Sequence, residues 1–212
     1  MRHTTLGLAR HTTLGLAFAA MIALSATPSF AKDKDDNFSF KLVVSSGAKA
    51  CTNLSTLAYG QATIAAFPPS GPFEKMHVEI FNMPPNGDFV IFIIQVPNKP
   101  FGLAWYDGDI LTDGDGHGVT DIIGRFSTGT FIVSPGAVPS VPVFPDDSTT
   151  GVKTAPVQLY HVGIWFNSVA EANAAGCPPN VVTPFTSNHQ AGIQVLNTSN
   201  FPDNYGPLLH VQ

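Results

Sequence analysis

The sequence predicts an all-β fold, an antiparallel β-sandwich with one short helix. Short apolar or alternating segments recur roughly every ten residues, and clusters of Gly, Pro, Asn and Asp separate them, as in sandwiches and barrels. Only one segment carries a convincing pair of helix start and stop signals. With 212 residues, 44% of them hydrophobic, the chain is long enough for one domain with a substantial core.

The first element is a predicted export signal over residues 1–31. Arg2 and Arg10 form a basic start, residues 14–26 are free of charge, and Ser29-Phe30-Ala31 offers small residues for cleavage after Ala31. We therefore expect a secreted or periplasmic protein. Residues 32–37 are predicted as a flexible polar N-terminus and residues 38–212 as a single β-sandwich domain.

Nine segments are predicted as strands. Residues 38–44 and 76–81 alternate apolar and polar side chains, which indicates one buried face. Residues 89–96 are apolar on both faces, which indicates a central, covered strand. Between them Asn86-Gly87 favours a tight turn, because both residues tolerate positive φ. The remaining predicted strands are 57–67, 101–106, 119–126, 129–133, 157–166 and 191–196.

The one predicted helix covers residues 168–175. Ser168 and Glu171 form a capping box, in which the serine oxygen accepts from a helical amide and the glutamate reaches back. Gly176 is placed to end the helix.

The only two cysteines, Cys51 and Cys177, are predicted to form one structural disulfide. A redox or metal pair is the alternative, and the absence of a CxxC spacing disfavours it. The bridge would tie the helix exit to the region around Cys51.

Residues 134–156 are predicted as a long irregular loop, because five prolines exclude a central strand or a helix. A loop of this length is an extended crossover or part of a functional surface.

Residues 107–121 form a turn rich in Asp and Gly, where Asp113, Asp115 and Asp121 are candidate calcium ligands. His117 and Gly124 stand where an EF-hand loop needs oxygen ligands, so that motif is excluded. The alternative is a plain hairpin loop. Asp107 and Asp109 are disfavoured as a catalytic acid and base, since exposed turn carboxylates lack the raised pKa of a catalytic acid.

Aromatic side chains give a second candidate surface. Trp105 and Trp165 end predicted strands beside loops, where they could stack on sugars or fill the core. His77 and His161 lie within predicted strands and are expected to be partly buried and hydrogen-bonded.

Charge and length exclude some partners. Loss of Arg2 and Arg10 with the signal takes the net charge from −5 to −7, which disfavours nucleic acid. Residues 89–96 are too few to cross about 30 Å of hydrocarbon, so we expect no membrane insertion after signal cleavage.

Two resemblances extend this interpretation. Residues 160–194 (YHVGIWFNSVAEANAAGCPPNVVTPFTSNHQAGIQ) and 195–208 resemble uncharacterised exported bacterial proteins, which brings no known activity. Residues 101–118 resemble hairpins of secreted Ig-like sandwich domains. This likeness implies a sandwich of Ig-like or jelly-roll type.

The sequence thus predicts an exported, non-catalytic binding, adhesive or envelope-associated module, with a polysaccharide or an envelope protein as partner and no cofactor except calcium. One alternative is a calcium-dependent carbohydrate-binding module. Another is a secreted hydrolase, which would need a buried His–carboxylate pair in a pocket.

Overall fold

The computed structural model describes residues 37–69, 71–126, 131–132, 157–183 and 190–211. All of them belong to one compact unit, Asp33–Gln212. The expected signal (1–31), residues 32–36 of the expected tail and the proline-rich loop 134–156 lie outside the described residues.

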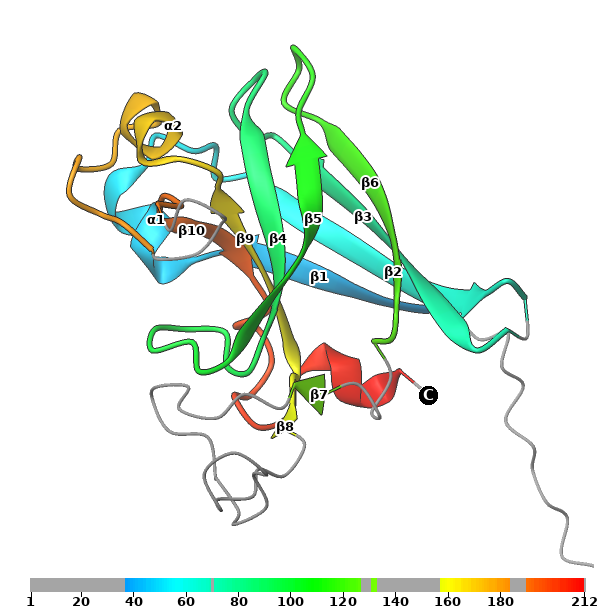
Figure 1. The fold of residues 1–212 in the computed structure, drawn as a ribbon. Coiled ribbons are helices and arrows are strands. Elements are labelled where there is room, and N and C mark those ends of the chain that lie inside the picture. Colours follow the sequence, from blue (N-terminus) through cyan, green and yellow to red (C-terminus); the bar gives the residue numbers. More distant parts are fainter. Residues whose placement is uncertain (1–36, 70, 127–130, 133–156, 184–189, 212) are drawn as a thin grey trace, which may run out of the picture. The chain divides into compact units, whose positions relative to one another are not determined.

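Among the described residues, eight strands form one hydrogen-bonded sheet in the order β5-β4-β9-β10-β1-β2-β3-β6, and each neighbouring pair is antiparallel (Figure 1). The all-β prediction is therefore confirmed. The strands are β1 (Phe38–Val44), β2 (Tyr59–Phe67), β3 (Phe73–Phe81), β4 (Asp88–Ile94), β5 (Ala104–Leu111), β6 (Gly118–Gly124), β9 (His161–Phe166) and β10 (Gln194–Asn197), with a separate pair of β7 (Phe131–Ile132) and β8 (Val157–Gln158).

Strand β1 joins the two halves of this sheet. Its residues 38–42 pair with β2, whereas Val43 and Val44 pair with β10. The terminal strands β5 and β6 are consecutive in the chain and meet at the Thr112–Gly118 bridge, so the sheet nearly closes on itself.

The main core lies inside this nearly closed sheet. Met76, Val78 and Ile80 of β3 are fully buried and alternate with outward residues, as the period of a strand requires. Strand β4 is buried on both faces, as predicted: Phe89 belongs to the main core, and Phe92 to a second cluster with Trp165.

The described part of the chain also contains two short α-helices, α1 (Ser46–Cys51) and α2 (Val169–Ala174), and a 3-10 helix over Pro207–His210. The capping box of α2 is present as predicted, whereas α1 was not predicted. Among the described residues, no helix has the length and apolarity needed to cross a bilayer.

The predicted disulfide is confirmed. Cys51 ends α1, Cys177 follows α2, and the bridge joins their Cα atoms at 4.7 Å across 126 positions of sequence. Both helices accordingly lie at the same end of the sheet (Figure 1).

Candidate functional site

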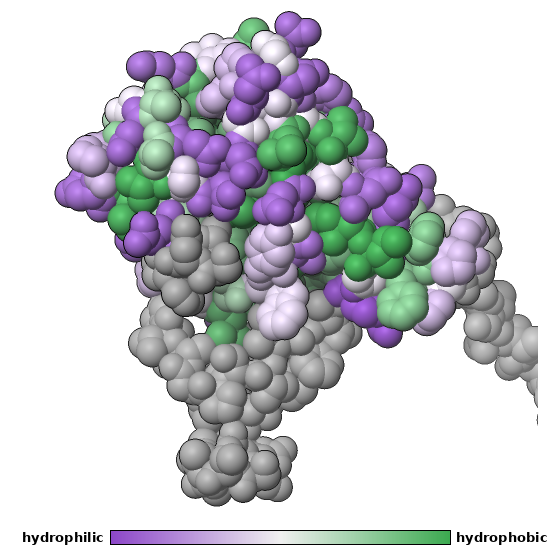
Figure 2. All heavy atoms as spheres, turned by 45° about the horizontal axis from the view of Figure 1, so that its top comes forward, coloured by the Kyte–Doolittle hydropathy of each residue, from purple (hydrophilic) through white to green (hydrophobic). Residues whose placement is uncertain are grey.

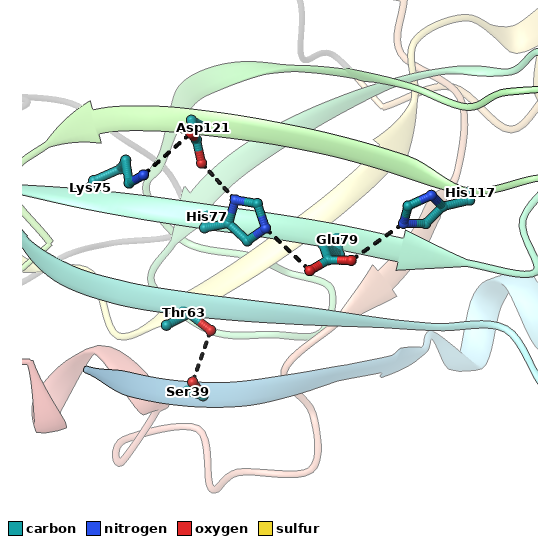
Figure 3. A network of polar contacts seen from close by, with 7 residues as sticks. All are labelled: Ser39, Thr63, Lys75, His77, Glu79, His117 and Asp121. Carbon is teal, nitrogen blue, oxygen red and sulfur yellow. Dashed lines mark hydrogen bonds and ion pairs between the residues drawn. The ribbon is translucent and has the colours of Figure 1, made fainter. Parts of the chain in front are cut away.

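A group of polar and charged side chains lies on the outer side of β1, β2, β3 and β6. Because β3 buries alternate residues, Lys75, His77 and Glu79 lie on its outer side. The register places Asp121 of β6 directly beside His77. We call this surface the polar face, and it comprises Ser39, Lys41, Gln61, Thr63, Lys75, His77, Glu79, His117 and Asp121. Figure 3 shows these residues except Lys41 and Gln61.

Five of these side chains form a continuous chain of contacts (Figure 3). His77 Nδ1 lies 2.6 Å from Asp121 Oδ1, and His77 Nε2 lies 3.2 Å from Glu79 Oε1. The other Glu79 oxygen, Oε2, lies 3.3 Å from His117 Nε2. Lys75 Nζ donates to Asp121 Oδ2 at 3.4 Å. The chain therefore runs from Lys75 on one side to His117 on the other.

The position of His77 between two carboxylates favours its protonated form. An ionised carboxylate only accepts hydrogen bonds, so both ring nitrogens must donate, which only the imidazolium can do. The hydrogen bond to Asp121 is the main cause that raises the pKa of His77, against a smaller opposite effect of burial. The same bond lowers the pKa of Asp121, and the contacts with His117 and His77 lower the pKa of Glu79.

A row of stacked rings borders this network. Tyr59 and Phe81 are neighbours across β2 and β3, with ring centroids 4.8 Å apart, and the Phe81 centroid lies 4.9 Å from that of His117. Lys41 Nζ lies 5.7 Å from the Tyr59 centroid. Since His117 belongs to both the stack and the ionic chain, the two arrangements hold each other in place.

Exposed apolar residues accompany the polar groups. Phe73, Val119 and Ile123 lie on the outer side of β3 and β6 and are exposed. Figure 2 shows one side of the molecule, where hydrophobic patches lie among hydrophilic side chains. The polar face can thus offer both hydrogen bonds and apolar contact.

The three predicted calcium ligands are not gathered in one place. Asp113 Oδ1 accepts from the backbone amides of Asp115 and His117, both at 2.9 Å, and so shapes the hairpin turn. Asp121 lies within β6 beside His77. Among the described residues, no group of three ligands could hold a metal ion. Calcium binding stays a prediction, which a melting curve with calcium and with chelator tests.

Asp107 corrects the expectation of an exposed turn carboxylate. It lies within β5 at a β-bulge, as the extra residue between the pairs Ile91–Gly108 and Phe92–Tyr106. Its Oδ2 is buried and has no hydrogen-bond partner among the described residues. Burial raises the pKa of this carboxyl to about 7.

The two tryptophans differ in their exposure to solvent. Trp105 is exposed on β5, where it can contact a ligand. Trp165 is fully buried and packs edge-on against Phe92 and Phe101. The ligand-surface role predicted for Trp165 is therefore wrong, because its ring fills the second core cluster.

The expectation of hydrogen-bonded histidines in strands is confirmed. His161 is buried, with Nδ1 2.8 Å from Thr198 Oγ1 and Nε2 3.1 Å from the Asp203 carbonyl oxygen, and burial lowers its pKa. Its partners are a hydroxyl and a carbonyl. The pairs of histidine with carboxylate side chains that the structure describes lie on the polar face instead.

Comparison with known proteins adds no family. No protein-family model matches the sequence, and no curated protein is significantly similar to it. The functional argument therefore rests on the geometry of the polar face.

Proposed function

We propose that this protein is an exported binding module that holds a polysaccharide on its polar face and does no chemistry on it. The observation that carries the proposal is the ordered chain Lys75–Asp121–His77–Glu79–His117. These side chains already hold one another in place, so they lose little conformational entropy when a ligand binds.

The chemistry of this surface suits sugars. A sugar hydroxyl both donates and accepts, so it can donate to the Glu79 and Asp121 carboxylates and accept from Lys75. The exposed side chains of Phe73, Val119 and Ile123 offer apolar contact to the C–H faces of sugar rings.

The ionisation of the two carboxyls is one reason to propose binding without catalysis. A general acid must keep a proton near the working pH, which needs a raised carboxyl pKa. On the polar face the pKa values of Glu79 and Asp121 are lowered by their histidine partners, so both carboxyls are ionised at neutral pH.

The proposed location outside the cytoplasm is supported by the Cys51–Cys177 disulfide, because such bridges persist in oxidising compartments. The export signal inferred for residues 1–31 agrees with this location.

The test is retention of the purified protein on a panel of polysaccharides, including cellulose, xylan, chitin and peptidoglycan. Glu79→Gln removes the carboxylate that both histidines contact, and we expect at least about tenfold weaker binding, equivalent to about 1.4 kcal/mol of binding free energy. Asp115→Asn removes an exposed carboxylate at the hairpin tip and serves as the matched control.

The proposal is wrong if no polysaccharide retains the wild-type protein. It is also wrong if Glu79→Gln binds as tightly as the wild type while both unfold at the same temperature, because the polar face would then not be the binding surface.

A further inference from the structure

A cavity of about 300 Å³ lies where three segments distant in sequence meet. Its walls are residues 53–55 after α1, residues 82–85 in the turn between β3 and β4, and Ala174 with Ala175 at the end of α2. This volume is at the lower end of the range for small-molecule sites and suits a single sugar unit.

The walls of the cavity are held in place by bonds that the chain already makes. The Cys51–Cys177 disulfide joins the first and third segments, and the Asn53 amide N–H donates to the Ala175 carbonyl at 2.9 Å. Asn82 Nδ2 donates to the Leu57 carbonyl at 3.1 Å, which fixes the second segment to the first. The cavity is therefore largely preformed.

The turn that forms the second wall is itself rigid. Asn82 has a φ of 55°, and the Met83 amide N–H donates to the Gly116 carbonyl at 3.0 Å. The Pro84 carbonyl accepts from Thr112 Oγ1 at 2.7 Å. Two successive prolines restrict the backbone further.

The residues that line the cavity carry no charge. Asn53 offers a side-chain amide, which both donates and accepts hydrogen bonds. Ser55 Oγ accepts from the Leu57 amide N–H, and the Ser55 hydroxyl can still donate a hydrogen bond to a ligand. Asn82 uses its Nδ2, and its Oδ1 makes no hydrogen bond to the part of the chain that the structure describes. Leu54, Met83, Pro84, Pro85 and the two alanines supply apolar surface.

We infer that this cavity binds one neutral sugar unit that carries an acetamido group. An acetamido group has an N–H donor, a carbonyl acceptor and a methyl, which match the asparagine amides and the apolar wall. A charged ligand would lose its hydration without meeting an opposite charge, so the uncharged lining disfavours it. None of the residues that line this cavity belongs to the polar face, and its ligand does not depend on the proposed function.

The test is titration of the purified protein with N-acetylglucosamine and, in parallel, with the charged glucosamine. Ala174→Leu adds three carbon atoms at an exposed position that lines the cavity. Ala170→Leu makes the same change at an exposed position of the same helix that does not line it. We expect saturable binding of N-acetylglucosamine that Ala174→Leu weakens at least about tenfold and Ala170→Leu leaves unchanged.

Three results overturn the inference: no saturable binding of N-acetylglucosamine, equal binding of glucosamine, or equal losses in both leucine variants. Glu79→Gln should leave this titration unchanged. Failure of the polysaccharide experiment on the polar face and failure of this titration are therefore distinguishable.

Discussion

At the scale of single residues, the surroundings of an ionisable group decide what the group can do. Asp107 and Asp121 are both aspartates of the same hairpin, on β5 and β6. Burial raises the pKa of Asp107 to about 7, whereas the hydrogen bond from His77 lowers that of Asp121. Asp107 thus weakens the fold when it ionises, and Asp121 strengthens it.

Replacement of Asp107 should change how stability depends on pH. Between its unfolded pKa near 3.8 and its folded pKa near 7, the folded state binds more protons, so stability falls as pH rises through this range. Asp107→Asn cannot ionise and should become more stable than the wild type above pH 7, by at most about 4 kcal/mol. Urea unfolding at several pH values measures the difference. Parallel profiles for the two proteins would contradict the prediction.

His77 should show the complementary behaviour. Its raised pKa means that its pairing with Asp121 contributes fully below the unfolded pKa of about 6.5 and is lost as pH rises through the folded pKa. His77→Gln should therefore cost about 0.2–1 kcal/mol at pH 5.5 and nothing at pH 9, since the pair is half exposed. Thermal unfolding at both pH values tests this, and a loss that persists at pH 9 would assign His77 a packing role.

Sequence alone could predict which side of a strand these residues occupy, but not which partners they meet. The alternation in β3 places His77 and Glu79 on one face. The contact with Asp121 depends on the register between β3 and β6, which is set by the inward residues and the path of the chain between them. The burial of Asp107 depends on a bulge that has no distinct sequence signal.

At the scale of elements, Glu171 connects the start of α2 to the neighbouring strand β4. Glu171 Oε2 accepts from the amide N–H and the hydroxyl of Ser168, at 3.0 and 2.8 Å. Glu171 Oε1 accepts from the Asp88 amide N–H at 2.9 Å, where β4 begins. One carboxylate therefore completes the capping box and fixes the helix to the sheet.

Truncation of the two capping residues should separate these roles. Ser168→Ala should lower the unfolding free energy by about 1 kcal/mol, the usual cost of a lost N-cap. Glu171→Ala should cost more, because it also leaves the Asp88 amide without its acceptor. Urea unfolding compares the variants, and equal losses would mean that the contact with β4 adds nothing.

The elements were predictable to different degrees for physical reasons. The capping box depends only on Ser168 and Glu171, which are close in sequence, so the sequence alone can predict it. Helix α1 has only six residues, includes Gly47, and relies on the Ser45 side chain and the nearby disulfide. Strand residues 157–166, predicted as one, divide into β8 and β9, because Leu159 and Tyr160 leave the ladder.

At the scale of the whole described unit, the disulfide closes a long loop between distant elements. In the chain-entropy account, such a bridge reduces the conformational entropy of the unfolded chain. Its loss from a small domain lowers the unfolding free energy by about 2–5 kcal/mol. The double variant Cys51→Ser and Cys177→Ser should have an unfolding free energy lower by about 2–5 kcal/mol and should therefore unfold at a lower temperature. A reducing agent should lower the melting temperature of the wild type and leave the double variant unchanged. No effect on either would show that the bridge adds nothing to stability.

Strand β1 has a consequence for the order in which the chain can fold. It is made before the other strands of the eight-stranded sheet, yet Val43 and Val44 pair with β10, which is made after all of them. Hairpins such as β2–β3 and β4–β5 can form as they emerge, because their partners are adjacent in the chain. The two halves of the sheet, by contrast, can pair through β1 only after β10 has been made. A nascent chain of this protein therefore stays incompletely folded until β10 has been made.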